Sequence, residues 1–213
     1  RGGDKPVPAM SEVLQQTVAQ ACKPLLQIEI KGLRAQNRSL YPELTLEHWF
    51  HQLLAHGFRR QVILHRRNGL RRLVSHLMAQ SSGVFVQSAA EPLAQRPALF
   101  IDTTAIQEGA ETHDLLHWLD LYATTHQQLV EALEQFCGAQ GLPAPLQLVY
   151  EESLEADPQV AYRQLCAWLE LDPEPVTLLH RRINPEPLPQ LIANWEEICG
   201  LVEPTPYAWM LAA

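Results

Sequence analysis

Short apolar runs alternate with longer segments of helical periodicity along most of this chain. Apolar runs typical of strands cover Leu25–Lys31, Gln61–Arg66, Ala98–Thr103 and Leu146–Tyr150. Apolar residues recur at helical spacing in Thr45–His56, Gly69–Gln80, Glu108–Gln140, Asp157–Leu169 and Pro187–Cys199. Strands that alternate with helices favour a parallel sheet joined by crossover helices. We therefore predict an α/β fold in three layers, a parallel sheet flanked by helices, forming a single domain over residues 1–213.

The charge balance argues against nucleic acid as a partner. The chain has 16 Lys and Arg against 24 Asp and Glu, a formal net charge of -8, whereas nucleic-acid-binding domains usually carry a basic surface. No apolar stretch is long enough for a transmembrane helix, and no signal peptide is visible. The 4 cysteines form no CxxC pair, which disfavours structural zinc and favours a reduced, cytoplasmic setting.

One short segment of this acidic chain is strongly basic. Six of the 16 cationic side chains fall between Arg59 and Arg72, and all six are arginines, which bind phosphate through paired hydrogen bonds. Arg67 follows a predicted strand, and the predicted helix that begins after Asn68 directs free N–H groups to the same place. Ser75 lies eight residues after Arg67, about two turns into that helix. This arrangement favours an anion site; the alternative is that the arginines only solvate a strand edge and a helix face.

Arg67 and Ser75, in the block VILHRRNGLRRLVSHLMA, resemble the 3′-phosphate-binding element of sulfotransferases that use 3′-phosphoadenosine 5′-phosphosulfate (PAPS). The resemblance is to the bacterial and carbohydrate-type branch of that family. Further segments resemble the family in their order and spacing: Ile28–Arg34, Leu99–Ile106, Leu148–Pro173 and Asn184–Leu211. Together they cover most of the chain from about residue 25 onward.

The resemblance implies a P-loop NTPase-like fold and the transfer of a sulfuryl group from PAPS, as co-substrate, to a hydroxyl group. The acceptor would be a small molecule, a glycan or a lipid-like molecule. Arg67 and Ser75 would bind the 3′-phosphate of PAPS, and Arg181 and Arg182 in a late loop are further contacts implied by the family. Lys31, at the end of a predicted strand, would approach the donor or the acceptor, or would only solvate the strand end. No residue is singled out as the catalytic base.

The chain departs from the family near its start. Sulfotransferases carry a Gly/Ser-rich loop whose backbone N–H groups face the phosphosulfate, and no such loop follows a strand in this sequence. We expect the loop, and the first strand, upstream of Arg1, so the fold would be N-terminally incomplete. A second reading is therefore a non-catalytic or degenerate relative that binds nucleotide. The third alternative, a P-loop kinase or NTPase, ranks last because the GxxxxGK[ST] motif of those proteins is absent. No metal is expected, because His113 and His117 have no obvious third ligand in the sequence.

Overall fold

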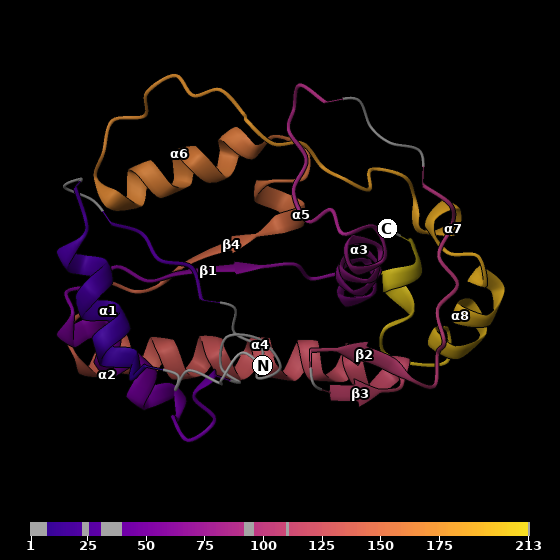
Figure 1. The fold of residues 1–213 in the computed structure, drawn as a ribbon, viewed down its shortest axis with the longest axis horizontal. Coiled ribbons are helices and arrows are strands. Elements are labelled where there is room, and N and C mark those ends of the chain that lie inside the picture. Colours follow the sequence, from indigo (N-terminus) through magenta and orange to yellow (C-terminus); the bar gives the residue numbers. More distant parts are fainter. Residues whose placement is uncertain (1–7, 23–25, 31–39, 92–95, 110, 213) are drawn as a thin grey trace, which may run out of the picture. The chain divides into compact units, whose positions relative to one another are not determined.

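The computed structural model describes residues 8–22, 26–30, 40–91, 96–109 and 111–212. Its helices are α1 (Met10–Ala19), α2 (Leu46–Ala55), α3 (Gly69–Ser82), α4 (Leu115–Ala139), α5 (Tyr150–Ser153), α6 (Pro158–Leu169), α7 (Leu188–Leu191), α8 (Trp195–Val202) and the 3-10 helix η2 (Ala208–Ala212). Its strands are β1 (Val62–His65), β2 (Ile106–Glu108), β3 (Glu111–His113) and β4 (Leu146–Val149) (Figure 1).

The protein mixes helices with short strands, in agreement with the predicted α/β class. Strands β1 and β4 form a small parallel sheet, whereas β2 and β3 form an antiparallel hairpin. Within the described ranges, no sheet has more than two strands, so the broad central sheet of the predicted three-layer fold is not seen there. The chain groups into two compact units: unit 1 comprises Arg1–Leu64 and Thr124–Leu148, and unit 2 comprises His65–Ala123 and Val149–Ala213.

Helices whose starts carry a local signal lie where the sequence predicts them. The side-chain oxygens of Thr45 and Asn68 accept backbone N–H groups one turn into α2 and α3, and Asp157 does the same at the start of α6. Such caps satisfy donors that the first helical turn leaves free. The predicted strands at Gln61–Arg66 and Leu146–Tyr150 are confirmed as β1 and β4, each slightly shorter than expected.

Two predicted strands are wrong where the structure describes them. Residues 26–30 of the Leu25–Lys31 run form no strand, and both ends of that run lie outside the described residues. The Ala98–Thr103 run forms only an isolated parallel bridge between Leu99 and Ile192. Two residues later, the backbone of Ile101 pairs with a side chain: Asn194 accepts the N–H of Ile101 and donates its amide to the carbonyl of the same residue. An asparagine here takes the place of a neighbouring strand.

Two predicted helices differ from the structure: one begins later than expected, and the other is divided in two. The stretch predicted as one helix over Glu108–Gln140 begins with the β2–β3 hairpin, whose turn contains Gly109 at a φ of 63°. Only glycine adopts that backbone conformation without strain. The helix predicted over Pro187–Cys199 is divided into α7 and α8, because Ile192 is extended (φ -119°, ψ 118°) and takes part in the bridge to Leu99.

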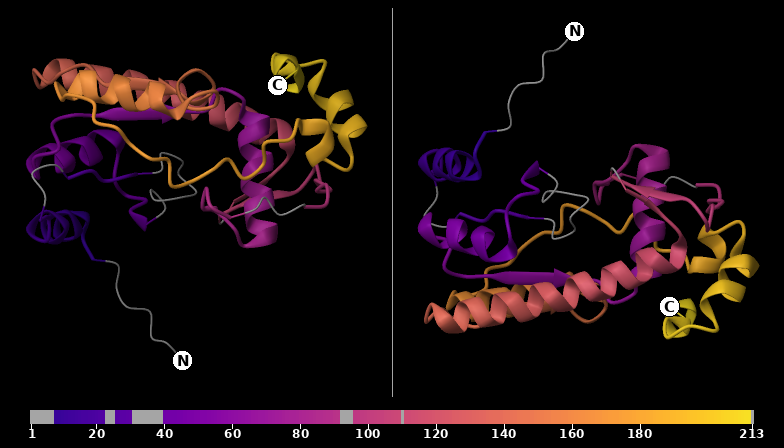
Figure 2. Two further views of the ribbon diagram at one scale, coloured as in Figure 1. Left: turned by 90° about the horizontal axis from the view of Figure 1, so that it is seen from above. Right: turned by 90° about the horizontal axis from the view of Figure 1, so that it is seen from below.

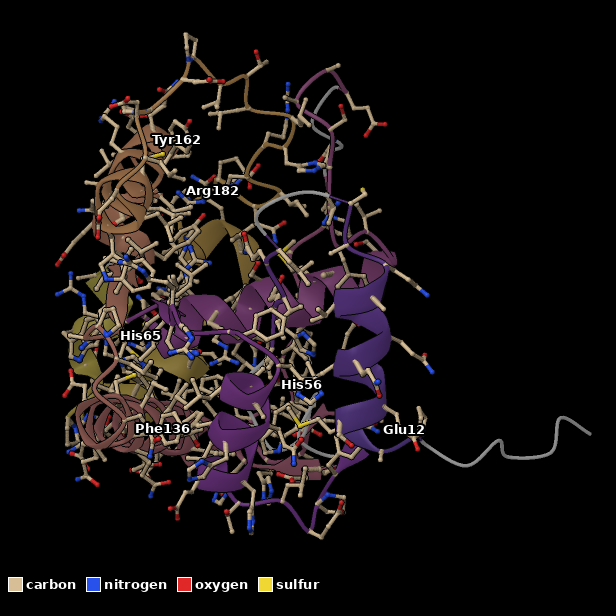
Figure 3. The ribbon with its side chains drawn as sticks, turned by 90° about the vertical axis from the view of Figure 1, so that its left-hand side faces the viewer. Glu12, His56, His65, Phe136, Tyr162 and Arg182 are labelled. Carbon is tan, nitrogen blue, oxygen red and sulfur yellow. The ribbon has the colours of Figure 1, made fainter. Side chains whose placement is uncertain are left out.

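Unit 1 has its own hydrophobic core. The core gathers buried side chains from α1, α2, β1 and the second half of α4: Met10, Leu14, Trp49, Phe50, Leu53, Ile63, Leu133, Phe136 and Cys137. Helices α1 and α2 lie side by side (Figures 1 and 2). Phe136, labelled in Figure 3, reaches α2 from α4, and its ring centre is 5.4 Å from that of Phe50.

Unit 2 is built around α3, which carries the basic segment. Leu70 and Leu73 of α3 are fully buried, as is Trp118 in the first half of α4. The first residue of α3, Gly69, approaches α4 so closely that an added Cβ atom would lie 3.3 Å from Cδ2 of Tyr122. The apolar face of α3 is therefore fixed in the core of unit 2, which leaves its polar face for the site described below.

Among the described helices, none is both long and apolar enough to span a bilayer.

Candidate anion-binding pocket

A pocket of about 180 Å³ in unit 2 brings together three arginines from three different elements. It is lined by Arg66, Arg71, Ser75, Tyr150, Arg182, Ile183, Asn184 and Leu191. The arginines come from the turn after β1, from α3 and from the segment between α6 and α7. Paired guanidinium groups and a hydroxyl are donors suited to a phosphate or sulfate group.

Helix α3 contributes Arg71 and Ser75, which lie four residues apart and therefore share one helix face. Arg71 is only 6% exposed, and its Nη2 donates to the backbone carbonyls of Asn184 at 2.9 Å and Glu186 at 2.6 Å. These bonds attach the 184–186 segment to α3. Arg71 thus helps to place the loop that carries Arg182, in addition to contributing its own charge.

Arg66 leaves the turn between β1 and α3 and enters the pocket beside Tyr150. Its guanidinium carbon lies 4.2 Å from the centre of the Tyr150 ring, a favourable cation–π contact. Burial lowers the pKa of Arg66, and the nearby charge of Arg182 lowers it further. Arg71 also has a lowered pKa, first because of burial and then because of Arg182 and Arg66. Arginine stays protonated despite such shifts, so the three cations repel one another and an anion bound among them would be stabilised.

Carboxylates from α5 and the turn after it lie on one side of this arginine group. Glu155 contacts Nη1 of Arg182 at 2.6 Å and Nη2 of Arg66 at 3.9 Å. Glu151 lies 4.0 Å from Nε of Arg66. Figure 3 labels Arg182, which the structure places on the segment that follows α6. Among the described residues, these two carboxylates pair with Arg66 and Arg182, whereas Arg71 donates to backbone carbonyls. Nε of Arg66 is buried and has no hydrogen-bond partner in that part of the chain.

Glu151 has a second and structural role at the start of α3. Its two carboxylate oxygens accept the backbone N–H groups of Arg67 at 3.1 Å and Asn68 at 3.0 Å. Burial by itself would raise the pKa of Glu151, but the hydrogen bonds from the N–H groups of Asn68, Arg67 and Glu151 itself, together with the charge of Arg66, lower it. The N–H groups of Arg67 and Asn68, just before the first helical residue, are thus occupied by a carboxylate of the protein itself, and the N–H of Arg71 in the first turn donates to the side chain of Asn68.

The structure brings together only some of the four residues predicted to bind the cofactor. Ser75 and Arg182 both line the pocket. The side chain of Arg67 is half exposed and pairs with Glu152 at 2.5 Å instead of lining it. Arg181 donates from Nη2 to the carbonyl of Ala89 and so joins two loops. Lys31 lies outside the described residues.

Four polar or aromatic residues of the pocket are missing from the sequence prediction: Arg66, Arg71, Tyr150 and Asn184. The four-residue spacing between Arg71 and Ser75 was a usable signal, because it places both on one face of a helix. No comparable signal distinguishes Arg66 from Arg67. Both follow the last residue of β1, and the strand alternation that would assign each to a face has already ended there.

The histidine pair considered as metal ligands, and two further polar segments of unit 2, have structural explanations. The rings of His113 and His117 are stacked with centres 3.9 Å apart, and no group of three metal-ligating side chains is found in the part of the chain that the structure describes. Ser82 ends α3, and Gly83 follows it at a φ of 69°, which makes this Ser-Gly pair a helix C-terminus. Asp102 accepts hydrogen bonds from the N–H and hydroxyl of Thr104, a local turn.

The pocket can therefore hold a compact anionic group by charge and by hydrogen bonds. Its lining residues contain no carboxylate, histidine or cysteine. The lining by itself therefore supplies no acid–base pair. Its chemistry is recognition of an anion, and a reaction would need further groups beside it. Comparison with protein-family models, curated proteins and solved structures finds no match to this chain.

Proposed function

We propose that this protein is a PAPS-dependent sulfotransferase and that its pocket binds the 3′-phosphate of the donor. In this proposal the chain has a P-loop NTPase-like fold and acts in the cytoplasm on a hydroxyl group of a glycan, a lipid-like molecule or another small molecule. The observation that carries it is the convergence of three side chains on one pocket: Arg66 and Ser75 come from the segment that resembles the 3′-phosphate element, and Arg182 comes from the late loop.

The size of the pocket supports a subsite for one group of a larger donor. Pockets that enclose a whole small ligand usually measure about 300–1,000 Å³. The 180 Å³ found here suits a phosphate and part of a ribose, with the remainder of the nucleotide outside. A 3′-phosphate is the group by which PAPS differs from most adenine nucleotides, so a dedicated arginine pocket would give selectivity for that donor.

Sulfuryl transfer would proceed by in-line displacement on the donor. The acceptor hydroxyl attacks sulfur, its proton passes to a base, and the 5′-phosphate of the nucleotide leaves with its bridging oxygen. The pocket residues act at the other end of the nucleotide, where they fix its orientation. Holding a reactant in one orientation lowers the barrier by removing rotational freedom before the reaction.

Isothermal titration calorimetry with 3′,5′-adenosine bisphosphate tests this proposal. We expect this ligand to bind at least tenfold more tightly than adenosine 5′-monophosphate, which lacks the 3′-phosphate. Arg66→Ala and Arg67→Ala form a matched pair, because the resemblance assigns the phosphate to Arg67 whereas the pocket contains Arg66. We expect Arg66→Ala to remove the preference and Arg67→Ala to retain it; equal affinity of the wild type for both nucleotides would reject the function.

The second candidate is a nucleotide-binding relative without transferase activity. It is favoured by the engagement of the N–H groups of Arg67 and Asn68 with Glu151, and of the N–H of Arg71 with Asn68, which leaves fewer backbone donors for a ligand near the start of α3. Transfer of labelled sulfate from PAPS to a panel of phenols, sugars and hydroxylated lipids separates the two. Binding of 3′,5′-adenosine bisphosphate without transfer to any acceptor would favour this second candidate.

A further inference from the structure

We infer that Glu155 determines which anions the arginine pocket accepts, by competing electrostatically with a bound dianion. This inference rests on the proposed function only in taking the pocket as an anion site. Glu155 is not among the site residues predicted from the sequence. We assign it a repulsive effect that weakens the binding of doubly charged anions more than that of singly charged ones.

The position of Glu155 supports this role. Its Oε1 is the shared partner of two pocket arginines, at 2.6 Å from Arg182 and 3.9 Å from Arg66. The contact with Arg182 has the length of a charged hydrogen bond, as a phosphate oxygen would make, and the contact with Arg66 is a longer ion pair. An incoming anion therefore meets guanidinium groups that are already partly neutralised.

A carboxylate in this position affects ligands according to their charge. If a guanidinium separates Glu155 from the ligand by roughly 6 Å, repulsion in water-like surroundings weakens binding of a dianion by about tenfold and of a monoanion by about threefold. The side chain of Glu155 is 31% exposed, so the water-like value is the appropriate one here. The unequal penalty makes the pocket more tolerant of singly charged groups than its three arginines alone would be.

Glu155→Gln removes the charge and keeps the shape. The amide oxygen of glutamine still accepts a hydrogen bond from Arg182, so the loop that carries this arginine stays in place. Glu152→Gln is the matched control, because Glu152 pairs with Arg67, whose side chain lies outside the pocket lining. The full chain is titrated at low ionic strength with sulfate and with methanesulfonate, which share one tetrahedral shape and differ in charge.

We expect Glu155→Gln to bind sulfate about tenfold more tightly and methanesulfonate about threefold more tightly than the wild type, with Glu152→Gln unchanged. Equal gains for the two ions, weaker binding, or no measurable sulfate binding by folded Glu155→Gln protein would overturn the inference. A gain for sulfate without any preference for 3′,5′-adenosine bisphosphate over adenosine 5′-monophosphate would support the role of Glu155 and reject the proposed donor.

Discussion

Replacement of Glu151 by glutamine should destabilise unit 2 by separating α5 from the start of α3. The carboxylate accepts the N–H groups of Arg67 and Asn68 at 3.1 and 3.0 Å, and each hydrogen bond to a charged group contributes about 1.5–3 kcal/mol. Glutamine keeps one acceptor oxygen and presents its own NH₂ donor to the second N–H. We therefore expect a loss of about 2 kcal/mol, the value of one charged hydrogen bond.

Urea unfolding followed by far-ultraviolet circular dichroism measures this loss, and thermal unfolding should show a decrease in Tm of about 4–8 °C. Glu152→Gln is the control, because the exposed pair of Glu152 with Arg67 is worth about 0–1 kcal/mol. Equal destabilisation by the two substitutions would refute the assignment of a special role to Glu151.

The pH dependence of stability in the wild type and in Glu151→Gln tests the same hydrogen bonds. The folded state lowers the pKa of Glu151, so its contribution is complete above the unfolded value of about 4.3 and is lost as the pH falls through the lower folded value. The stability difference between wild type and Glu151→Gln should therefore be largest near neutral pH and should narrow below about pH 4. A difference that is the same at pH 7 and pH 3 would contradict the hydrogen bonds to the charged carboxylate.

Substitutions at three further positions test the packing and helix capping in unit 2. Gly69→Ala should cost about 1–3 kcal/mol in urea unfolding, because its Cβ would meet the ring of Tyr122 at 3.3 Å, and unchanged stability would show that the ring can move. Tyr122→Phe should cost about 1–3 kcal/mol, because it removes the hydroxyl that donates to the buried carboxylate of Glu108; a neutral effect would mean that other groups satisfy this carboxylate. Asp157→Ala should cost about 1 kcal/mol by removing the cap of α6, whereas Asp157→Asn should retain most of it, and equal losses would argue against the capping bond to Gln159.

Elements with local signals could be predicted from the sequence. Thr45, Asn68 and Asp157 each stand just before an amphipathic segment, and each caps the helix that follows. The side chain and the N–H group that it satisfies are two or three residues apart in the chain, so the sequence contains both partners.

Elements that depend on distant partners could not be predicted in the same way. The Ala98–Thr103 run has the composition of a strand, but its backbone at Ile101 pairs with the side chain of Asn194, 93 residues away. The predicted C-terminal helix is broken for the same reason, since Ile192 is extended to meet Leu99. Periodicity reports which residues are apolar and does not report which backbone groups will find partners elsewhere.

The residues of the candidate site also differ in how far the sequence could predict them. Ser75 was predicted because it lies about two helical turns after Arg67, a spacing that resembles the 3′-phosphate element, and Arg182 because the same resemblance implies a basic late loop. The choice between Arg66 and Arg67 depends instead on carboxylates about 84 residues later in the chain. Nothing within the basic segment itself states which arginine those carboxylates will engage.

The side chains of the segment Tyr150–Glu155 explain why the adjacent arginines Arg66 and Arg67 have different contacts. Glu151 fixes the turn by binding the N–H of Arg67, and Glu152 then engages the side chain of that same residue. Arg66, one position earlier, lies against the Tyr150 ring and reaches Glu155. If this segment determines the assignment, Glu152→Ala should leave Arg67 unpaired without bringing it into the pocket, because the turn is held by Glu151. Anion affinity should then stay unchanged in Glu152→Ala and should fall only when Arg66 is also replaced. A gain in affinity in the single variant would show that Arg67, once released from Glu152, contacts the ligand directly.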